Sequence, residues 1–267
     1  MSASLSGRLP DPPGVLRLGR RDFPAGHLGV MAIVNRTPDS FYRPGLTWDP
    51  AAAMERVHEV VAEGADIVDI GGVPARPGDD VDVREEIRRT VPFIAAVRDA
   101  YPDLVISVDT WRHEVGREAC AAGADLLNDS WGGWDARLAE VAAEFGAGVV
   151  CSHAGGLPPR TRPFRVAYQD LVEDVLNGTL ALAARAVDAG VDPARILIDP
   201  AHDFGKNSWH SLEITRHLAD LAATAVCAWL GARVFRAHHV RETRHALSTV
   251  SAIRGDIPPA RVVRGLA

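Results

Sequence analysis

Polar residues follow almost every short apolar run of this chain, and several of them could bind a metal ion or an anion. They are, in chain order, Asn35, Asp69, Asp109, Asn128 with Asp129, His153, Asp199, and Arg236 with His238. An asparagine in such a place can hold a metal ion or a phosphate oxygen. Any one of these residues could instead cap a helix or bond to a loop. Seven apolar runs that all end in polar residues, however, indicate one shared site.

The apolar runs are short and rich in valine and isoleucine, as strands buried on both faces must be. They cover residues 30–34, 66–70, 104–108, 125–127, 148–151, 195–198 and 232–235. Amphipathic patterns typical of helices lie between and after them, at 49–63, 83–99, 113–122, 135–145, 168–189, 208–222 and 241–253. A repeated strand–helix order predicts parallel strands joined by right-handed crossovers.

Two α/β architectures have this order, an open doubly wound sheet and a closed barrel. No G-x-G-x-x-G motif follows any run, which speaks against the dinucleotide-binding open sheet. A (β/α)8 barrel of the TIM type gathers the carboxyl ends of its strands into one pocket, so the polar run ends favour a barrel. The segment 14–24 alternates as a short hairpin does and could plug the bottom of such a barrel. We expect a flexible segment at 1–14 and a single barrel domain at 15–267.

Composition excludes several classes of function. The chain has 267 residues and a net charge of −6, so nucleic acid is not a natural partner. No apolar stretch reaches the roughly 18–20 residues that a membrane helix needs, and residues 1–14 do not resemble a signal peptide. The three cysteines are widely scattered, which we interpret as a sign of a reducing cytoplasm.

Several motifs occur in a specific order along the chain. They are N-x-T-P-D-S-F at 35–41, D-I-G-G at 69–72 with R-P-G at 76–78, S-x-D-T at 107–110, N-D at 128–129, and R-x-H at 236–238. From about Gly29 onward this set resembles the dihydropteroate synthases, a family similar to the pterin-dependent methyltransferases. Within that family the chain looks most similar to inactive actinobacterial paralogues, whose first loop also reads N-R-T-P-D-S-F-Y.

The resemblance implies a reaction and a set of site residues. The family joins a dihydropterin pyrophosphate to para-aminobenzoate with a magnesium ion and releases pyrophosphate. By similarity, Asp109, Asn128 and Asp199 would bind the pterin, since a carboxylate accepts from a ring N–H and an amino group together. The remaining matches are Arg236 and His238 as catalytic residues at the pyrophosphate, Asn35 at the Mg2+, and Arg76, Pro77, Phe204 and Lys206 in the pyrophosphate and aminobenzoate loops. We also expect a homodimer.

The chain departs from the family pattern in four places. Residues 42–45 read Tyr-Arg-Pro-Gly, so a carboxylate and a glycine of the first loop are lost, and Pro74-Ala75 replaces two hydroxyl residues of the second loop. Ala201-His202 replaces a small, glycine-containing sequence. Most importantly, the family's seventh strand, which ends in a pterin-binding lysine, and the helix after it have no counterpart. On the order of 30 residues are missing, because 224–230 resembles the tail of a helix that leads directly to the last strand.

These departures leave several hypotheses open. We favour a dihydropteroate synthase-like protein of folate biosynthesis that binds the pterin pyrophosphate with reduced or lost synthase activity. An active synthase is the first alternative, since the pterin carboxylates and the Arg236–His238 pair are present. A non-catalytic barrel that binds a pterin or a partner protein is the second. Methyl transfer is less well supported, because the R-P-G motif fits the synthase better.

Overall fold

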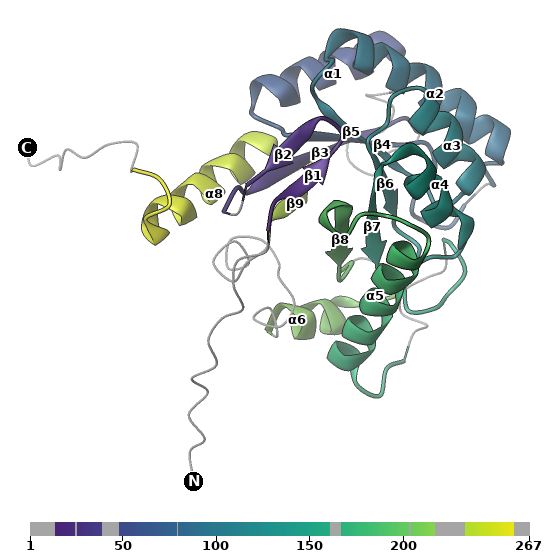
Figure 1. The fold of residues 1–267 in the computed structure, drawn as a ribbon, viewed down its shortest axis with the longest axis vertical. Helices are drawn as coiled ribbons and strands as arrows, with labels where there is room; N and C mark the ends of the chain where they lie inside the picture. Colours follow the sequence, from purple (N-terminus) through teal and green to yellow (C-terminus); the bar gives the residue numbers. More distant parts are fainter. Residues whose placement is uncertain are drawn as a thin grey trace, which may run out of the picture.

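The computed structural model describes residues 14–24, 26–38, 48–78, 80–160, 167–202, 204–216 and 233–258. Strands and helices alternate through most of this part of the chain (Figure 1). The strands are β1 (Leu16–Leu18), β2 (Arg21–Phe23), β3 (Gly29–Asn35), β4 (Ile67–Gly71), β5 (Val105–Asp109), β6 (Leu126–Asp129), β7 (Gly148–Ser152), β8 (Ile196–Asp199) and β9 (Val234–Ala237). The helices are α1 (Pro50–Ala62), α2 (Val83–Ala100), α3 (His113–Ala121), α4 (Arg137–Phe145), α5 (Leu171–Asp188), α6 (Ser208–Arg216) and α8 (Val240–Arg254), with a 3-10 turn η2 at Pro193–Arg195.

The main sheet has seven strands in the order β8-β7-β6-β5-β4-β3-β9, and every neighbouring pair is parallel. It curls so that helices cover its outer face (Figure 1), which confirms the predicted α/β barrel-type fold. Within the described residues, β8 and β9 are the two ends of the strand order. The predicted absence of a seventh unit falls on 217–232, between α6 and β9, which lies outside the described residues.

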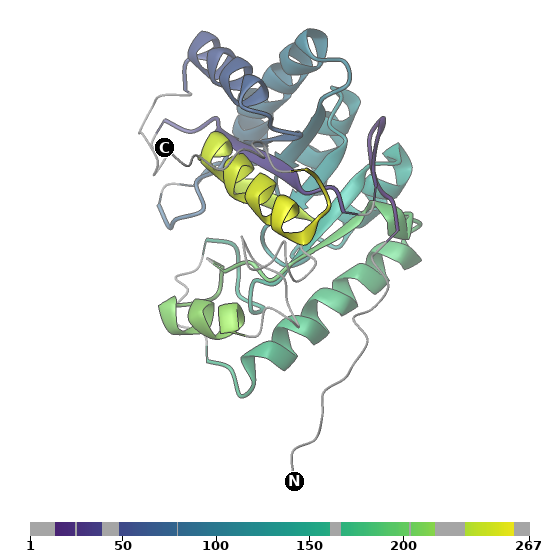
Figure 2. The same ribbon diagram turned by 90° about the vertical axis from the view of Figure 1, so that its left-hand side faces the viewer.

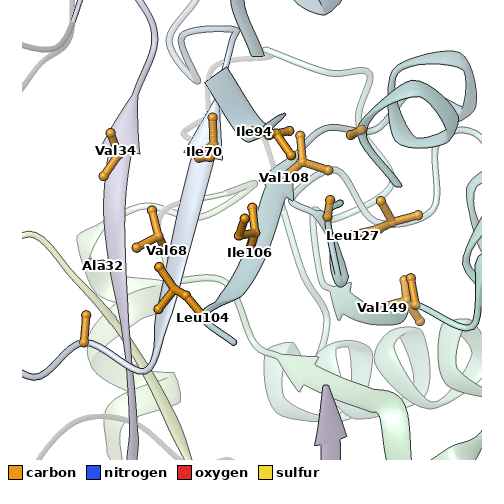
Figure 3. Close-up of a cluster of buried hydrophobic side chains, with 14 of the residues drawn as sticks. Ala32, Val34, Val68, Ile70, Ile94, Leu104, Ile106, Val108, Leu127 and Val149 are labelled. Carbon is orange, nitrogen blue, oxygen red and sulfur yellow. The ribbon is translucent and has the colours of Figure 1, made fainter. Parts of the chain in front are cut away.

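The outer face of the sheet forms the larger hydrophobic core, against the helices. Residues two apart on a strand share a face, and the register aligns Val34, Ile70, Val108 and Leu127 in one row (Figure 3). The starts of α1, α2 and α5 are held by aspartate caps, such as Asp82, whose side chain accepts from the backbone of Glu85. Figure 2 shows α5 and α6 next to one another at the β8 end of the sheet, while α8 packs on β3 and β9 at the other end. No helix within the described residues is long and apolar enough to cross a membrane.

The bottom of the sheet's inner face is covered by the β1–β2 hairpin, as the sequence predicted. Leu16, Leu18 and Phe23 of the hairpin form a second buried cluster with inner residues of the strands, namely Met31, Ile67, Val105, Leu126 and Val150. Asp66, just before β4, fastens the hairpin: its carboxylate accepts from Arg21 at 3.4 Å, from His27 at 3.2 Å and from Val30 N at 2.9 Å. The hairpin therefore closes the end of the fold opposite to the strand carboxyl ends.

Gly19 at the turn of the hairpin offers a test of this contact. Its φ is +56°, and a Cβ there would lie 2.2 Å from Asp125 Oδ1. Gly146 has a φ of +62° but nothing within 4 Å of its Cβ position, so Gly146→Ala should cost only about 1 kcal/mol of backbone strain. Gly19→Ala should cost about 2–4 kcal/mol, because Asp125 must also move. Urea unfolding checks both; equal losses would contradict the tight contact at Gly19.

Candidate functional site

The carboxyl ends of β3, β4, β5 and β6 lie level with one another. Asn35 pairs in register with Gly71, Gly71 with Asp109, and Asp109 with Asn128. Since side chains two residues apart point to the same face, the inner face at this end also carries Asp69, Ser107 and Ser130. The sheet thus gathers polar side chains above the apolar inner layer that packs on the hairpin.

Asp69 is the most connected residue of this group and is fully buried. Its carboxylate accepts from Ser107 Oγ at 2.7 Å, from Asn128 Nδ2 at 3.1 Å and from Arg236 Nε at 2.6 Å. The sequence placed Asp69 among the strand-end residues expected to share a site but gave it no role of its own. The signal for a central role is its position two residues before Gly71, on the same face of β4.

Asp109 shares Arg236 with Asp69. Arg236 Nη2 donates to Asp109 Oδ2 at 2.8 Å, and Ser130 Oγ donates to Asp109 Oδ1 at 2.8 Å. Burial raises the pKa of Asp109 to about 6, with Asp69 and Asp199 adding to the increase and Arg236 opposing it. Burial would lower the pKa of Arg236, but the two carboxylates outweigh it and the pKa is raised. Arg236 therefore remains a cation between two carboxylates. Ser130 is a residue of the site that the sequence analysis missed.

Asp199, at the end of β8, belongs to the same region. It is close enough to Asp109 and Arg236 to raise the pKa of both. Its Oδ1 accepts from Ala201 N at 2.7 Å, which fixes the turn after the strand. Asp109, Asn128 and Asp199 thus converge at one end of the fold, as the sequence predicted. That they bind a pterin edge stays a prediction.

Asn35 and His238 also lie at this end. A Cβ added to Gly71 would lie 3.0 Å from Asn35 Oδ1 and 3.6 Å from Asp109 Cβ, so Asn35 and Asp109 face each other across a glycine. The pKa of His238 is lowered by burial and then by the positive charge of Arg236 and its other basic neighbours. The imidazole of His238 is therefore neutral at pH 7, and it can accept or donate a proton.

The loop residues predicted to bind the pyrophosphate and aminobenzoate have different surroundings. Arg76 and Pro77 are exposed on the β4–α2 loop, where Arg160 Nε donates to Arg76 O at 3.1 Å. Phe204 packs edge-to-face on Trp131, with ring centroids 5.0 Å apart. The assignment of these residues to substrate contacts stays a prediction, and Asp39–Phe41 of the first loop lie outside the described residues.

Lys206 is 2% exposed, and its ammonium group binds backbone. Nζ donates to His153 O at 2.7 Å, to Ala201 O at 3.0 Å and to Phe204 O at 2.9 Å. An ammonium has three N–H donors, so in this arrangement Lys206 ties the β8–α6 loop to the end of β7. That Lys206 also contacts a substrate stays a prediction.

Two polar residues at strand ends face away from this group. Asp129 accepts from the backbone N–H groups of Trp131 and Gly133 and shapes the turn after β6; burial raises its pKa to about 6. His153 follows inward-facing Ser152, and its Nε2 lies 2.7 Å from Asp174 Oδ1 on α5. The sequence left His153 open as a site candidate, and the structure turns its ring toward a helix on the outer face.

Comparisons with known proteins agree with this arrangement. Residues 31–261 match the model of the pterin binding enzyme family. The chain is 53% identical to "Inactive dihydropteroate synthase 2" of Mycobacterium tuberculosis over 275 residues, covering 89% of this chain and 86% of the relative. The structure of Mycobacterium tuberculosis Rv1207 is 45% identical, with a TM-score of 0.72, and the match covers 91% of this chain and 99% of that one.

A ligand-bound structure is also similar. Burkholderia cenocepacia dihydropteroate synthase, complexed with 7,8-dihydropteroate, is 30% identical with a TM-score of 0.79, over 91% of this chain and 98% of that one. The family match over most of the chain agrees with the parallel barrel-type sheet and the polar group at its carboxyl end. This chain therefore belongs to the family of pterin-binding enzymes that includes the dihydropteroate synthases.

Proposed function

We propose that this protein binds a dihydropterin pyrophosphate at the carboxyl end of its sheet and has reduced or lost dihydropteroate synthase activity. The observation that carries the proposal is the convergence of Asp109, Asn128 and Asp199 on the inner face. Carboxylates accept hydrogen bonds from the N–H and amino groups of a pterin edge. Arg236 lies beside them and supplies a positive charge for the pyrophosphate.

The contacts of Arg236 support reduced activity. Its Nε and Nη2 are already bonded to Asp69 and Asp109 at 2.6 and 2.8 Å. A leaving pyrophosphate would have to compete with these two carboxylates for the guanidinium group, so less of its charge is available to stabilise the transition state. The second loop carries Pro74-Ala75, which cannot donate side-chain hydrogen bonds. A relative with half of its residues identical is named inactive, which agrees with this interpretation.

Asn35 fits the predicted magnesium site. Its Oδ1 lies beside Gly71, where an added Cβ would come to 3.0 Å from it and crowd this oxygen. Magnesium binds oxygen ligands and commonly takes few protein groups together with substrate phosphates. Asn35 would thus hold Mg2+ with the pyrophosphate, where the ion would neutralise phosphate charge.

We further propose a homodimer in the cytoplasm, with para-aminobenzoate as second substrate wherever activity remains. Exposed apolar residues support an interface: Trp209 and Leu212 of α6 are 75% and 50% exposed, and Ile198 on the outer face of β8 is 47% exposed. The free thiols of Cys120 and Cys151 are buried, as suits a reducing compartment.

Titration calorimetry with the pterin pyrophosphate and an assay for dihydropteroate test the proposal. We expect binding by the unmodified protein and a rate far below that of an active family member. Asp199→Ala should weaken binding about 10–100-fold, since one buried charge-assisted hydrogen bond contributes about 1.5–3 kcal/mol. Asp188→Ala, which removes an exposed carboxylate at the end of α5, is the matched control. Turnover at the rate of an ordinary synthase would refute the loss of activity.

Binding should also depend on pH. Because the pKa of Asp109 is raised to about 6, its carboxylate is charged at pH 8 and mostly protonated at pH 5. A protonated carboxyl accepts fewer hydrogen bonds, so pterin affinity should fall about tenfold as the pH falls from 7 to 5. Calorimetry across this range measures the change, and Asp109→Asn should remove it. A profile as steep in Asp109→Asn as in the unmodified protein would assign the effect to another group.

A further inference from the structure

We propose that Ser152 is a ligand contact of this site, an inference that rests on the proposed pterin binding. Ser152 is the last residue of β7 and is 1% exposed. Its Oγ is buried and has no hydrogen-bond partner among the described residues. A buried hydroxyl without a hydrogen-bond partner destabilises the folded protein. A bound ligand that accepts from this hydroxyl would remove that cost.

The position of Ser152 directs its side chain into the site. Val150, two residues earlier on β7, belongs to the inner apolar cluster with Met31 and Ile67. Since residues two apart share a face, Ser152 also points inward. It pairs in register with Asp199 on β8, so the two side chains lie next to each other at the mouth of the fold.

Two other buried serines of the inner face, within the described part of the chain, both donate hydrogen bonds. Ser107 Oγ donates to Asp69 Oδ1 at 2.7 Å, and Ser130 Oγ donates to Asp109 Oδ1 at 2.8 Å. Ser152 is the exception among these three serines. A group that the protein leaves unsatisfied where its neighbours are satisfied is the one expected to bond to an incoming molecule.

The pair of Asp199 and Ser152 also indicates what part of the ligand it binds. A carboxylate only accepts hydrogen bonds, whereas a hydroxyl can donate one. Side by side they match a ring edge in which an N–H lies next to a carbonyl oxygen, as in the pyrimidinone half of a pterin. Asp199 would accept from the N–H, and Ser152 would donate to the oxygen.

Two measurements on Ser152→Ala test the inference, with 6-hydroxymethylpterin as the probe. Calorimetry should show affinity about tenfold weaker, the effect of losing one hydrogen bond to a ligand. The melting temperature of the ligand-free protein should rise by about 2–4 °C, because an unsatisfied buried hydroxyl has been removed. Thr179→Val on α5 is the control: it removes a buried hydroxyl that donates to Val175 O at 2.8 Å, and it should lower the melting temperature and leave affinity unchanged.

Each alternative outcome has a distinct meaning. Unchanged affinity of Ser152→Ala, in a protein that binds the pterin, would overturn the contact and leave the proposed function standing. A lower melting temperature, as in Thr179→Val, would show that the hydroxyl is already satisfied and would also overturn it. If the unmodified protein binds no pterin, the proposed function and this inference both fail.

Discussion

Replacing Arg236 by alanine is expected to lower the free energy of unfolding by about 3 kcal/mol. Arg236 stands between Asp69, whose side chain is fully buried, and Asp109, whose side chain is 22% exposed. Without the guanidinium group these two carboxylates lie close together without a cation, and one of them must take up a proton. Arg236 itself is 31% exposed, so water screens part of its attraction to the two carboxylates. We therefore expect a loss at the lower end of the about 3–5 kcal/mol that breaking a buried ion pair costs.

Urea unfolding at pH 7 measures this loss, and Arg241→Ala provides the comparison. Arg241 is 67% exposed and lies 3.6 Å from Glu63, and ion pairs at the surface contribute about 0–1 kcal/mol. Arg236→Ala should also weaken the binding of inorganic pyrophosphate. Equal losses of stability in the two variants would show that the Asp69–Arg236–Asp109 group is solvated and does not organise the site.

Asp66→Ala is expected to have an effect of similar size, about 3 kcal/mol, at the opposite end of the sheet. Besides the hairpin contacts, the Asp66 carboxylate accepts from Arg244 Nη2 of α8 at 2.5 Å. The change to alanine removes the carboxylate that accepts from Arg21, Arg244 and the buried backbone N–H of Val30. Asp22→Ala, on the exposed side of the same hairpin and 3.9 Å from Arg17 Nε, should change stability by less than about 0.5 kcal/mol.

The Asp66 effect should depend on pH with a definite sign. Burial would raise the pKa of Asp66, but hydrogen bonds from His27, Val30 and Arg244 outweigh it and lower the pKa to about 2. A lowered folded-state pKa stabilises the protein above the unfolded value near 4, and that stability is lost as the pH falls toward 2. The difference between the unmodified protein and Asp66→Ala should therefore shrink by about 2 kcal/mol between pH 5 and pH 2. A constant difference over this range would contradict the charged role of Asp66.

The arrangement of strands and helices could be predicted from the sequence because it rests on local patterns. Nearly continuous apolar runs such as Ile67–Gly71, interrupted only by Asp69, are buried on both faces, and such burial can be inferred from composition. The alternation of residues 14–24 likewise predicted the hairpin that covers the bottom of the sheet. Polar residues after each run then indicated the end of the fold at which a site would form.

Which of those polar residues belong to the site was decided only by the tertiary structure. Asn128 and Asp129 are adjacent at the end of β6, yet one bonds to Asp69 inside the sheet and the other to its own turn. Moving a strand by one residue turns each of its side chains to the opposite face of the sheet. The position that a strand takes is fixed by its neighbours in the sheet, which lie far away in sequence. For the same reason the contact of Asp69 with Arg236 and that of Ser130 with Asp109 emerged only when β4, β5, β6 and β9 were placed together.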